Sequence, residues 1–279
     1  MIMHDPNSKA FSHAGTRSTN DAVASVPMAI EPGRFDRVRE WLVSVERTWV
    51  GWSLAPPERV LAEAAWQPDA PGTYCRRCGG SVGTGEQTSD GCGSCRDHVV
   101  NTDRVVRLDA YRDPMRAWVR AIKYRAWAEM AECLGRRLGD GLYRAVRDGG
   151  APDMNRIVVT PIPMPWQRRL YRGIDHARLI AESAAVAMGV PVVQLLAAEN
   201  GPPQVSLTSA RRSRRGVRMT VRSGIASGSL RDTVVVLIDD VRTSGGSLNA
   251  AARLVRRLGP RQVVAGVLAV TDDPARRVS

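Results

Sequence analysis

Asp239 and Asp240 are adjacent carboxylates that stand just before a short run of hydroxyl and glycine residues, Thr243 to Ser247. Glycines let a backbone approach a ligand closely, and a helix that begins after such a run presents free N–H groups and a positive dipole end. The run is therefore suited to hold a phosphate. The carboxylates would face sugar hydroxyls, or a metal ion that bridges sugar and diphosphate, because hard cations prefer carboxylate oxygens. A simpler interpretation is that the aspartates only cap the next helix.

The residues around this pair indicate a strand, a turn and a helix. The five apolar residues 234–238 predict a strand buried on both faces of a parallel sheet. After the turn, apolar residues spaced at three and four predict a helix; they are Leu248, Ala251, Ala252, Val255 and Leu258. Ligands of open α/β sheets bind in the crevice at the carboxyl ends of the strands. The sequence therefore predicts a phosphate and sugar site at the end of this strand.

A second group of reactive residues consists of four cysteines in two Cys-x-x-Cys pairs. They are Cys75, Cys78, Cys92 and Cys95. This spacing is typical of a structural zinc ribbon, in which four thiolates converge on one Zn²⁺ at about 2.3 Å. Disulfides are the alternative, but a cytoplasmic chain keeps its thiols reduced. The fifth cysteine, Cys133, lies in a helical pattern and is expected to be buried by packing.

The charge of the chain favours anionic partners. The formal net charge is +12, and Lys9 and Lys123 are the only lysines, so arginine supplies nearly all of the positive charge. A basic excess favours nucleic acid, nucleotide phosphates or pyrophosphate. The planar fork of arginine matches phosphate better than a point charge does.

The chain divides into four segments by composition. Residues 1–33 are polar and have no apolar h-region, which predicts a disordered leader rather than a signal peptide. Residues 34–70 are predicted to be helical, residues 71–100 to form the four-cysteine knuckle, and residues 105–272 to form the α/β domain. No apolar stretch approaches the roughly 18 residues of a membrane span, so we expect a cytoplasmic protein without membrane insertion.

Helix and strand patterns alternate in the second half of the chain. Helices are predicted at residues 115–147 and about 174–188, and strands at residues 157–160, 192–196 and 263–270. Such alternation predicts an α/β fold with a parallel sheet and right-handed crossovers.

Four motifs in this order resemble the ComF family, the amidophosphoribosyltransferase-like family linked to DNA uptake in competent bacteria. They are the cysteine knuckle, the element Ile122 to Arg125, the proline-rich loop 161–165 that leads into Arg168 to Gly173, and the strand and turn around Asp239. The last of these resembles the 5-phosphoribosyl-1-pyrophosphate (PRPP) motif of type I phosphoribosyltransferases. The likeness covers roughly residues 70–272.

The resemblance implies a type I phosphoribosyltransferase-like fold, structural Zn²⁺, and Mg²⁺ bound with PRPP. It implies catalytic roles for four residues: Asp239, Asp240, Lys123 and Arg125. It implies PRPP-binding roles for nine others: Thr243, Ser244, Gly245, Gly246, Ser247, Tyr124, Arg168, Arg169 and Arg172. The arginines at 168, 169 and 172 would lie on a flexible loop over the site. Gln204, Leu207 and Arg212 match a further family pattern.

Several positions depart from the family pattern. Ile174, Asp175 and His176 stand where the family usually has Phe-Asn-Gln, and Arg242 stands where it has an apolar or small residue. His176 is the only histidine in this half of the chain, and a lone histidine at a helix start is expected to be structural. These departures leave the acceptor substrate and turnover open.

Three functions stay open at this stage. The first is a PRPP-binding protein of the ComF type that acts in DNA uptake or processing, with DNA-uptake or recombination proteins as partners. The second is an active enzyme that transfers ribose 5-phosphate from PRPP to a nitrogenous acceptor. The third is a single-stranded DNA-binding protein with a relic PRPP pocket; Arg76, Arg77 and the arginines of residues 211–222 favour it. That cluster has no interleaved aromatic residues for base stacking.

Overall fold

The computed structural model describes residues 55–83, 85–88, 90–93, 95, 100–150, 153–199 and 218–272. The expected leader, the first part of the expected helical segment, and the pattern residues Gln204, Leu207 and Arg212 lie outside these ranges. So do the arginines of the 211–222 cluster that precede residue 218. Within the described ranges, no helix combines the length and apolar character that a membrane crossing requires.

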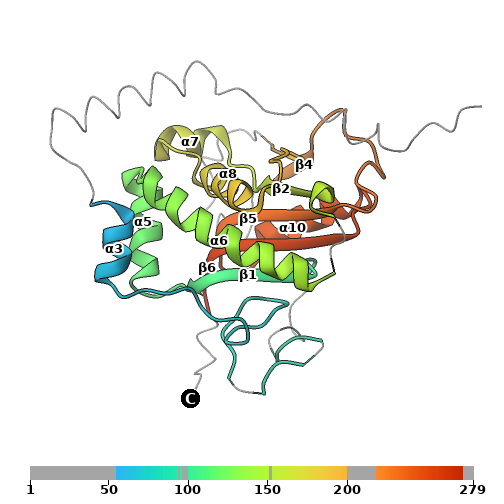
Figure 1. Ribbon diagram of the computed structural model, residues 1–279. Coiled ribbons are helices and arrows are strands. Elements are labelled where there is room, and N and C mark those ends of the chain that lie inside the picture. The colour runs from blue at the N-terminus through green and yellow to red at the C-terminus, as the bar shows by residue number, and fades with distance from the viewer. Residues whose placement is uncertain are drawn as a thin grey trace, which may run out of the picture.

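The centre of the molecule is a parallel sheet of four strands in the order β1-β6-β5-β2 (Figure 1). The strands are β1 (Arg104–Ala110), β2 (Ile157–Pro161), β5 (Val234–Arg242) and β6 (Gln262–Val270). Val236 of β5 pairs with Val159 on one side and with Val264 on the other. This confirms the predicted α/β class, with β5 as an inner strand buried over most of its length.

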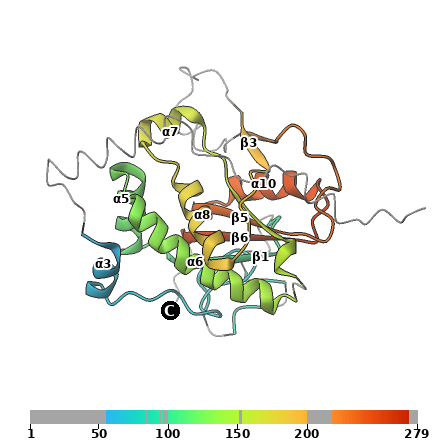
Figure 2. The same ribbon diagram turned by 45° about the horizontal axis from the view of Figure 1, so that its top comes forward.

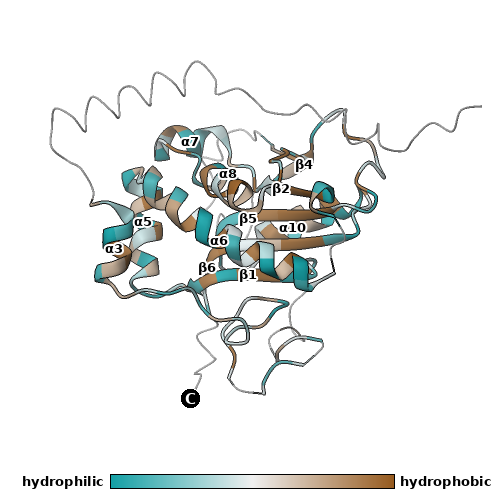
Figure 3. Cartoon of the chain, viewed as in Figure 1, coloured by the Kyte–Doolittle hydropathy of each residue, from teal (hydrophilic) through white to brown (hydrophobic). Residues whose placement is uncertain are grey.

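Helices cover both faces of the sheet. One face packs against α5 (Met115–Arg125), α6 (Ala128–Asp148) and α8 (His176–Met188), and the other packs against α10 (Gly246–Arg256). Figure 2 shows α6 and α8 side by side in front of the strands, and Figure 3 shows that the central strands are mainly hydrophobic. Backbone contact between α6 and α8 is close, since a Cβ on Gly139 would lie 2.5 Å from the carbonyl oxygen of Ala184.

The predicted helix over residues 115–147 is two helices, so the prediction of one continuous element was wrong. Ala126 adopts the left-handed conformation with φ of 51° between α5 and α6. Trp127 is buried in the core directly after it. The break therefore turns the chain so that the two apolar faces pack against each other, which hydrophobic spacing alone does not indicate.

The basic stretch after the proline-rich loop is a short helix, α7 (Trp166–Arg172), and not the expected flexible loop. Pro165 precedes its first residue, and Gly173 ends it in the left-handed conformation with φ of 75°. A glycine after a helix is a favourable end, because glycine tolerates positive φ. α7 and the C-terminal end of α5 are in contact.

Several smaller elements also differ from the prediction. The strand predicted at residues 192–196 is displaced to β3 (Leu196–Ala198), which pairs antiparallel with β4 (Met219–Val221) in a separate small sheet. Val192 makes only an isolated bridge, to Val159. At the start of the described part, α3 (Pro57–Glu63) packs against α6.

Candidate functional site

Asp239 and Asp240 lie near the end of β5, which continues to Arg242 and is therefore longer than the predicted five-residue strand. Asp240 is 5% exposed. Val236 and Ile238, which alternate with it along the strand, pack into the core beneath α5, α6 and α8. Because alternate residues of a strand share a face, Asp240 points into the layer of these helices.

Two basic side chains contact Asp240 from different helices. Nζ of Lys123, near the end of α5, lies 3.0 Å from Oδ1 of Asp240. Nε2 of His176, the first residue of α8, lies 2.5 Å from Oδ2 of Asp240. Nη1 of Arg172, the last residue of α7, lies 3.2 Å from the same Nε2. Three helices therefore meet the end of β5 in one charged cluster.

The two aspartates ionise very differently. Burial tends to raise the pKa of Asp240, but the hydrogen bond from His176 and the charge of Lys123 outweigh it and hold that pKa well below its usual range. Burial, and then the charge of Asp240, raise the pKa of Asp239 to about 7. Two neighbouring carboxylates resist simultaneous ionisation. The folded protein therefore favours ionisation of Asp240 over ionisation of Asp239.

The turn after β5, which the sequence predicts to be a phosphate loop, leads directly into α10. Gly245 precedes α10 with φ of 76°, and no side chain caps the start of that helix. Thr243, Ser244 and Gly246 are exposed. The guanidinium of Arg242 covers Gly245, since a Cβ there would lie 2.9 Å from its Nε. The turn thus offers hydroxyls and backbone N–H groups to an anion, and Gly245 is required there both by its φ and by the space it leaves.

The other residues expected to bind PRPP surround the cluster less closely. The ring of Tyr124 is 61% exposed, and the guanidinium carbon of Arg172 lies 5.9 Å from its centroid. Arg125 is exposed as the last residue of α5, and Arg168 and Arg169 are exposed on α7. Of the predicted residues, the structure therefore brings together Lys123, Arg172 and the aspartate pair, and leaves these three arginines at the rim.

His176 is the residue of this cluster that sequence reasoning missed. It is 3% exposed, and its neighbour Asp175 begins α8 by accepting a hydrogen bond from the N–H of Arg178 at 3.3 Å. The available signal was the departure from the Gln that the family usually has at this position. The contact with Asp240 depends on how α8 packs on β5, which the local sequence does not reveal.

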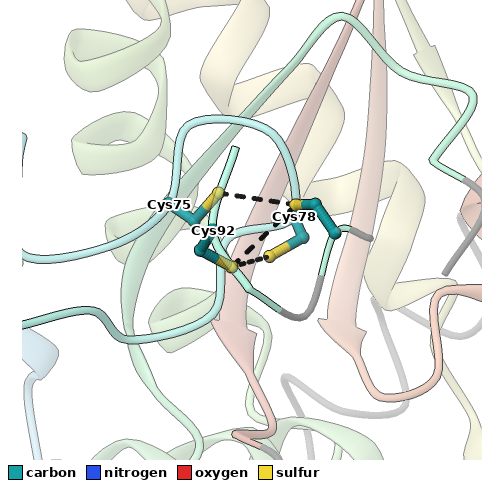
Figure 4. A group of neighbouring side chains, drawn as sticks. Cys75, Cys78 and Cys92 are labelled. Atoms are coloured by element: carbon teal, nitrogen blue, oxygen red, sulfur yellow. Dashed lines mark hydrogen bonds between the residues drawn. The ribbon is translucent and has the colours of Figure 1, made fainter. Parts of the chain in front are cut away.

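The four knuckle cysteines converge as the zinc prediction requires. Their ligand atoms all lie within 4.8 Å of one another, and all four side chains are buried. The sulfur–sulfur distances are 3.7 Å for Cys75–Cys95, 3.6 Å for Cys78–Cys92 and 3.9 Å for Cys92–Cys95. A tetrahedron of sulfurs around Zn²⁺, with bonds of about 2.3 Å, has edges of about 3.8 Å. The four thiols therefore fit a zinc ion, and Figure 4 shows the sulfurs of the labelled cysteines turned toward one another.

The thiol chemistry also suits a metal. A hydrogen bond from Cys78 is the main cause that lowers the pKa of the Cys75 thiol, which favours the thiolate form that binds a metal. Cys133 is 1% exposed within α6, as predicted, and its thiol donates to Glu58 at 3.3 Å. It lies outside the cysteine cluster.

The cysteine segment is attached to the edge strand β1 (Figure 1). The N–H of Val105 donates to the carbonyl of Arg76 at 2.6 Å. Gly79 adopts φ of 76° and lies so close to the sheet that a Cβ would meet Val105 at 2.8 Å and Val270 at 2.9 Å. The knuckle therefore packs tightly on the sheet.

Comparison with known proteins agrees with this architecture. A family model described as a phosphoribosyl transferase domain matches residues 178–279. Competence protein F of Haemophilus influenzae is 24% identical over 196 residues, which is 68% of this chain and 81% of that protein. DNA utilization protein YhgH of Salmonella typhi is 28% identical over 193 residues, with the same two coverages, 68% and 81%. Adenine phosphoribosyltransferase of Mycobacterium marinum is 33% identical over 109 residues, 39% of this chain and 57% of that protein.

Two solved structures align over about half of the chain. The allosteric regulatory enzyme of purine biosynthesis aligns with 49% of this chain and 25% of its own, at 18% identity and a TM-score of 0.29. The purine phosphoribosyltransferase of Pyrococcus horikoshii aligns with 48% of this chain and 70% of its own, at 16% identity and a TM-score of 0.29.

The parallel sheet with helices on both faces, together with the matched domain, defines a phosphoribosyltransferase-like protein. Within that class, the chain is a homologue of competence protein F and YhgH and has a clustered set of four cysteines before the domain. The expected resemblance to the ComF family is thereby confirmed.

Proposed function

We propose that this chain binds PRPP with Mg²⁺ at the carboxyl end of β5 and acts in DNA uptake or DNA processing in the cytoplasm. The observation that carries the proposal is the convergence of Lys123, Arg172 and the aspartate pair beside the turn Thr243 to Ser247. The relatives named for competence and DNA utilization support the DNA role. DNA-uptake or recombination proteins are the expected partners.

Each part of the site has a proposed role in holding PRPP. The aspartate pair serves the ribose hydroxyls and Mg²⁺, and the turn 243–247 serves the 5-phosphate. Lys123, Tyr124 and Arg125 serve the pyrophosphate, and the exposed arginines of α7 lie over the site. Mg²⁺ would supply positive charge to the diphosphate leaving group, while preorganised basic side chains stabilise the charge that develops as the C1–O bond breaks.

Calorimetric titration with PRPP and Mg²⁺ tests the proposal. We expect micromolar binding by the zinc-loaded protein and loss of binding in the double variant Asp239→Asn, Asp240→Asn. Pyrophosphate release with nitrogenous acceptors, followed in parallel, separates an active transferase from a protein that only binds PRPP. A folded, zinc-loaded protein that does not bind PRPP would contradict the proposal.

A second candidate, binding of single-stranded DNA, is favoured by a surface beside this site. Its aromatic and apolar members are largely exposed: the exposed fraction is 61% for Tyr124, 47% for Trp166, 72% for Leu170 and 84% for Tyr171. Arginines of α5 and α7 lie among them. Exposed aromatic rings interleaved with arginines suit stacked bases and a phosphate backbone. We call Tyr124 together with the residues of α7, Trp166–Arg172, the α7 surface.

A further inference from the structure

The two aspartates of β5 have different surroundings, which indicates that they have different roles. We propose that His176 is a positioning residue that, together with Lys123, fixes Asp240 in place. Asp239 is then the carboxylate of the pair that meets the ribose of PRPP. The inference rests on the proposed function and refines it, because it divides between two residues a role that the family motif gives to both.

The first observation is that both oxygens of Asp240 are engaged. Oδ1 lies 3.0 Å from Nζ of Lys123, and Oδ2 lies 2.5 Å from Nε2 of His176. Among the described residues, Oδ2 has no hydrogen-bond partner beyond this contact, and Nδ1 of the imidazole has none. The imidazole therefore faces Asp240 through Nε2, and with its proton on Nε2 it donates to Asp240 rather than accepting from the guanidinium of Arg172. Asp240 is also only 5% exposed, so little of its carboxylate is open to a ligand.

The second observation is the contrasting state of Asp239. Its Oδ1 accepts the N–H of Asp240 at 2.9 Å, which fixes the direction of its side chain. In the described part of the chain no ion pair engages it, and the residue keeps partial exposure. Since both oxygens of Asp240 already contact basic side chains, ligand hydroxyls or a cation reach the carboxylate of Asp239 more readily.

The third observation concerns the origin of the imidazole. Asp175 caps α8, so the first residue of that helix is delivered to the end of β5 at a fixed position. A Gln amide can also donate a hydrogen bond to a carboxylate. A donor at position 176, rather than an imidazole as such, is what the geometry requires.

Four variants and one control test the inference. We expect His176→Ala to weaken PRPP·Mg²⁺ binding roughly tenfold and His176→Gln to stay within about threefold of wild type. Without ligand at pH 8, Asp240→Asn should lower the Tm by about 4 °C or more, because it leaves two basic groups facing an uncharged buried side chain. Asp239→Asn should abolish PRPP binding and leave the Tm unchanged or higher. The control Glu182→Gln, on α8 away from the cluster, should change neither quantity.

Two results would overturn the inference. One is a His176→Gln variant that binds PRPP as weakly as His176→Ala, since a positioning donor must be replaceable by another donor. The other is an equal loss of Tm in Asp239→Asn and Asp240→Asn. If the wild type does not bind PRPP, the proposed function fails and the ligand role of Asp239 fails with it. The Tm contrast between the two Asn variants then decides separately whether Asp240 is the fixed member of the pair.

Discussion

Arg107 of β1 donates two hydrogen bonds to one carboxylate oxygen of Asp69, from Nε at 3.0 Å and from Nη2 at 2.7 Å. The arginine side chain is 2% exposed, and it also donates to the carbonyl of Gly79 at 2.7 Å and to Oγ of Ser81 at 2.9 Å. Its guanidinium lies 5.1 Å from the ring centroid of Tyr74. A single buried cation therefore joins the sheet to the cysteine segment and to the chain that leads into it.

The first prediction follows from this arrangement. Replacing one member of a buried ion pair leaves the other charge without compensation, so Arg107→Met should lower the free energy of unfolding by roughly 3–5 kcal/mol. Urea denaturation of the zinc-loaded protein measures the loss. Arg59→Met is the control, because Arg59 pairs with Glu63 on the surface, with both side chains more than half exposed, and such pairs contribute about 1 kcal/mol or less. Similar losses in the two variants would contradict the structural role of Arg107.

The second prediction concerns the metal. The purified protein should hold one Zn²⁺ per chain, and Cys92→Ser should release it, because three thiolates bind Zn²⁺ less tightly than the four that converge here. Cys133→Ala should keep its zinc, since Cys133 lies in α6 outside the cluster. Elemental analysis after dialysis against a chelator measures the content. A protein without zinc, or with disulfides between these cysteines, would disprove the metal site.

The sequence predicted those parts of the site that lie together along the chain. The aspartate pair, its glycine turn and the cysteine pairs are local patterns, and their residue types carry the chemistry. Strand β1 was not predicted, because Arg107 and Asp109 interrupt its apolar run. They are tolerated in the interior only because Asp69 and Trp66, which are distant in sequence, partner them. The break at Ala126 was missed for a related reason, since it depends on Trp127 packing into the core.

The contact between His176 and Asp240 could not be predicted in the same way. It exists because α8 packs on the face of the sheet toward which Asp240 points, and the order of the strands decides that arrangement. A resemblance can indicate that position 176 is close to the site. It cannot say which of the two aspartates the side chain contacts.

The third prediction is a pH dependence of stability without Mg²⁺. The pKa of Asp239 is raised from 3.8 to about 7 in the folded protein, first by burial and then by Asp240. The folded state therefore binds the proton more tightly than the unfolded state does. The resulting stability is fully present below pH 4 and is lost as the pH rises through about 7. Asp239→Asn removes this loss, so its Tm should exceed that of wild type increasingly from pH 4 to pH 8, with no further change above.

Thermal unfolding of wild type and Asp239→Asn across this range measures the difference. The difference between the two proteins, rather than either curve alone, isolates Asp239 from the other titrating groups. Asp240 contributes in the opposite direction, since its lowered pKa gives stability that is lost only in acid. A Tm difference that stays constant with pH would show that Asp239 ionises in the folded state as it does in the unfolded chain.

The fourth prediction tests the α7 surface as a site for single-stranded DNA. Tyr171 is 84% exposed on α7. Stacking on an aromatic side chain contributes about 1–3 kcal/mol per base, so Tyr171→Ala should weaken oligonucleotide binding by roughly fivefold to 150-fold. Val186→Ala is the matched control, because Val186 is 78% exposed but lies on α8. Fluorescence anisotropy with a labelled oligonucleotide measures both.

The arginines of the same surface should contribute to DNA binding through phosphate contacts, which weaken as the salt concentration rises, rather than through base stacking. A double variant Arg168→Gln, Arg169→Gln removes two phosphate contacts, so the slope of log K against log salt concentration should fall by roughly 1.4 for a single strand. Tyr171→Ala should leave that slope nearly unchanged while it lowers the affinity, since a ring releases no counterions. If neither the slope nor the affinity responds to these variants, the DNA contacts of this protein lie elsewhere and the α7 surface serves only to cover the PRPP site.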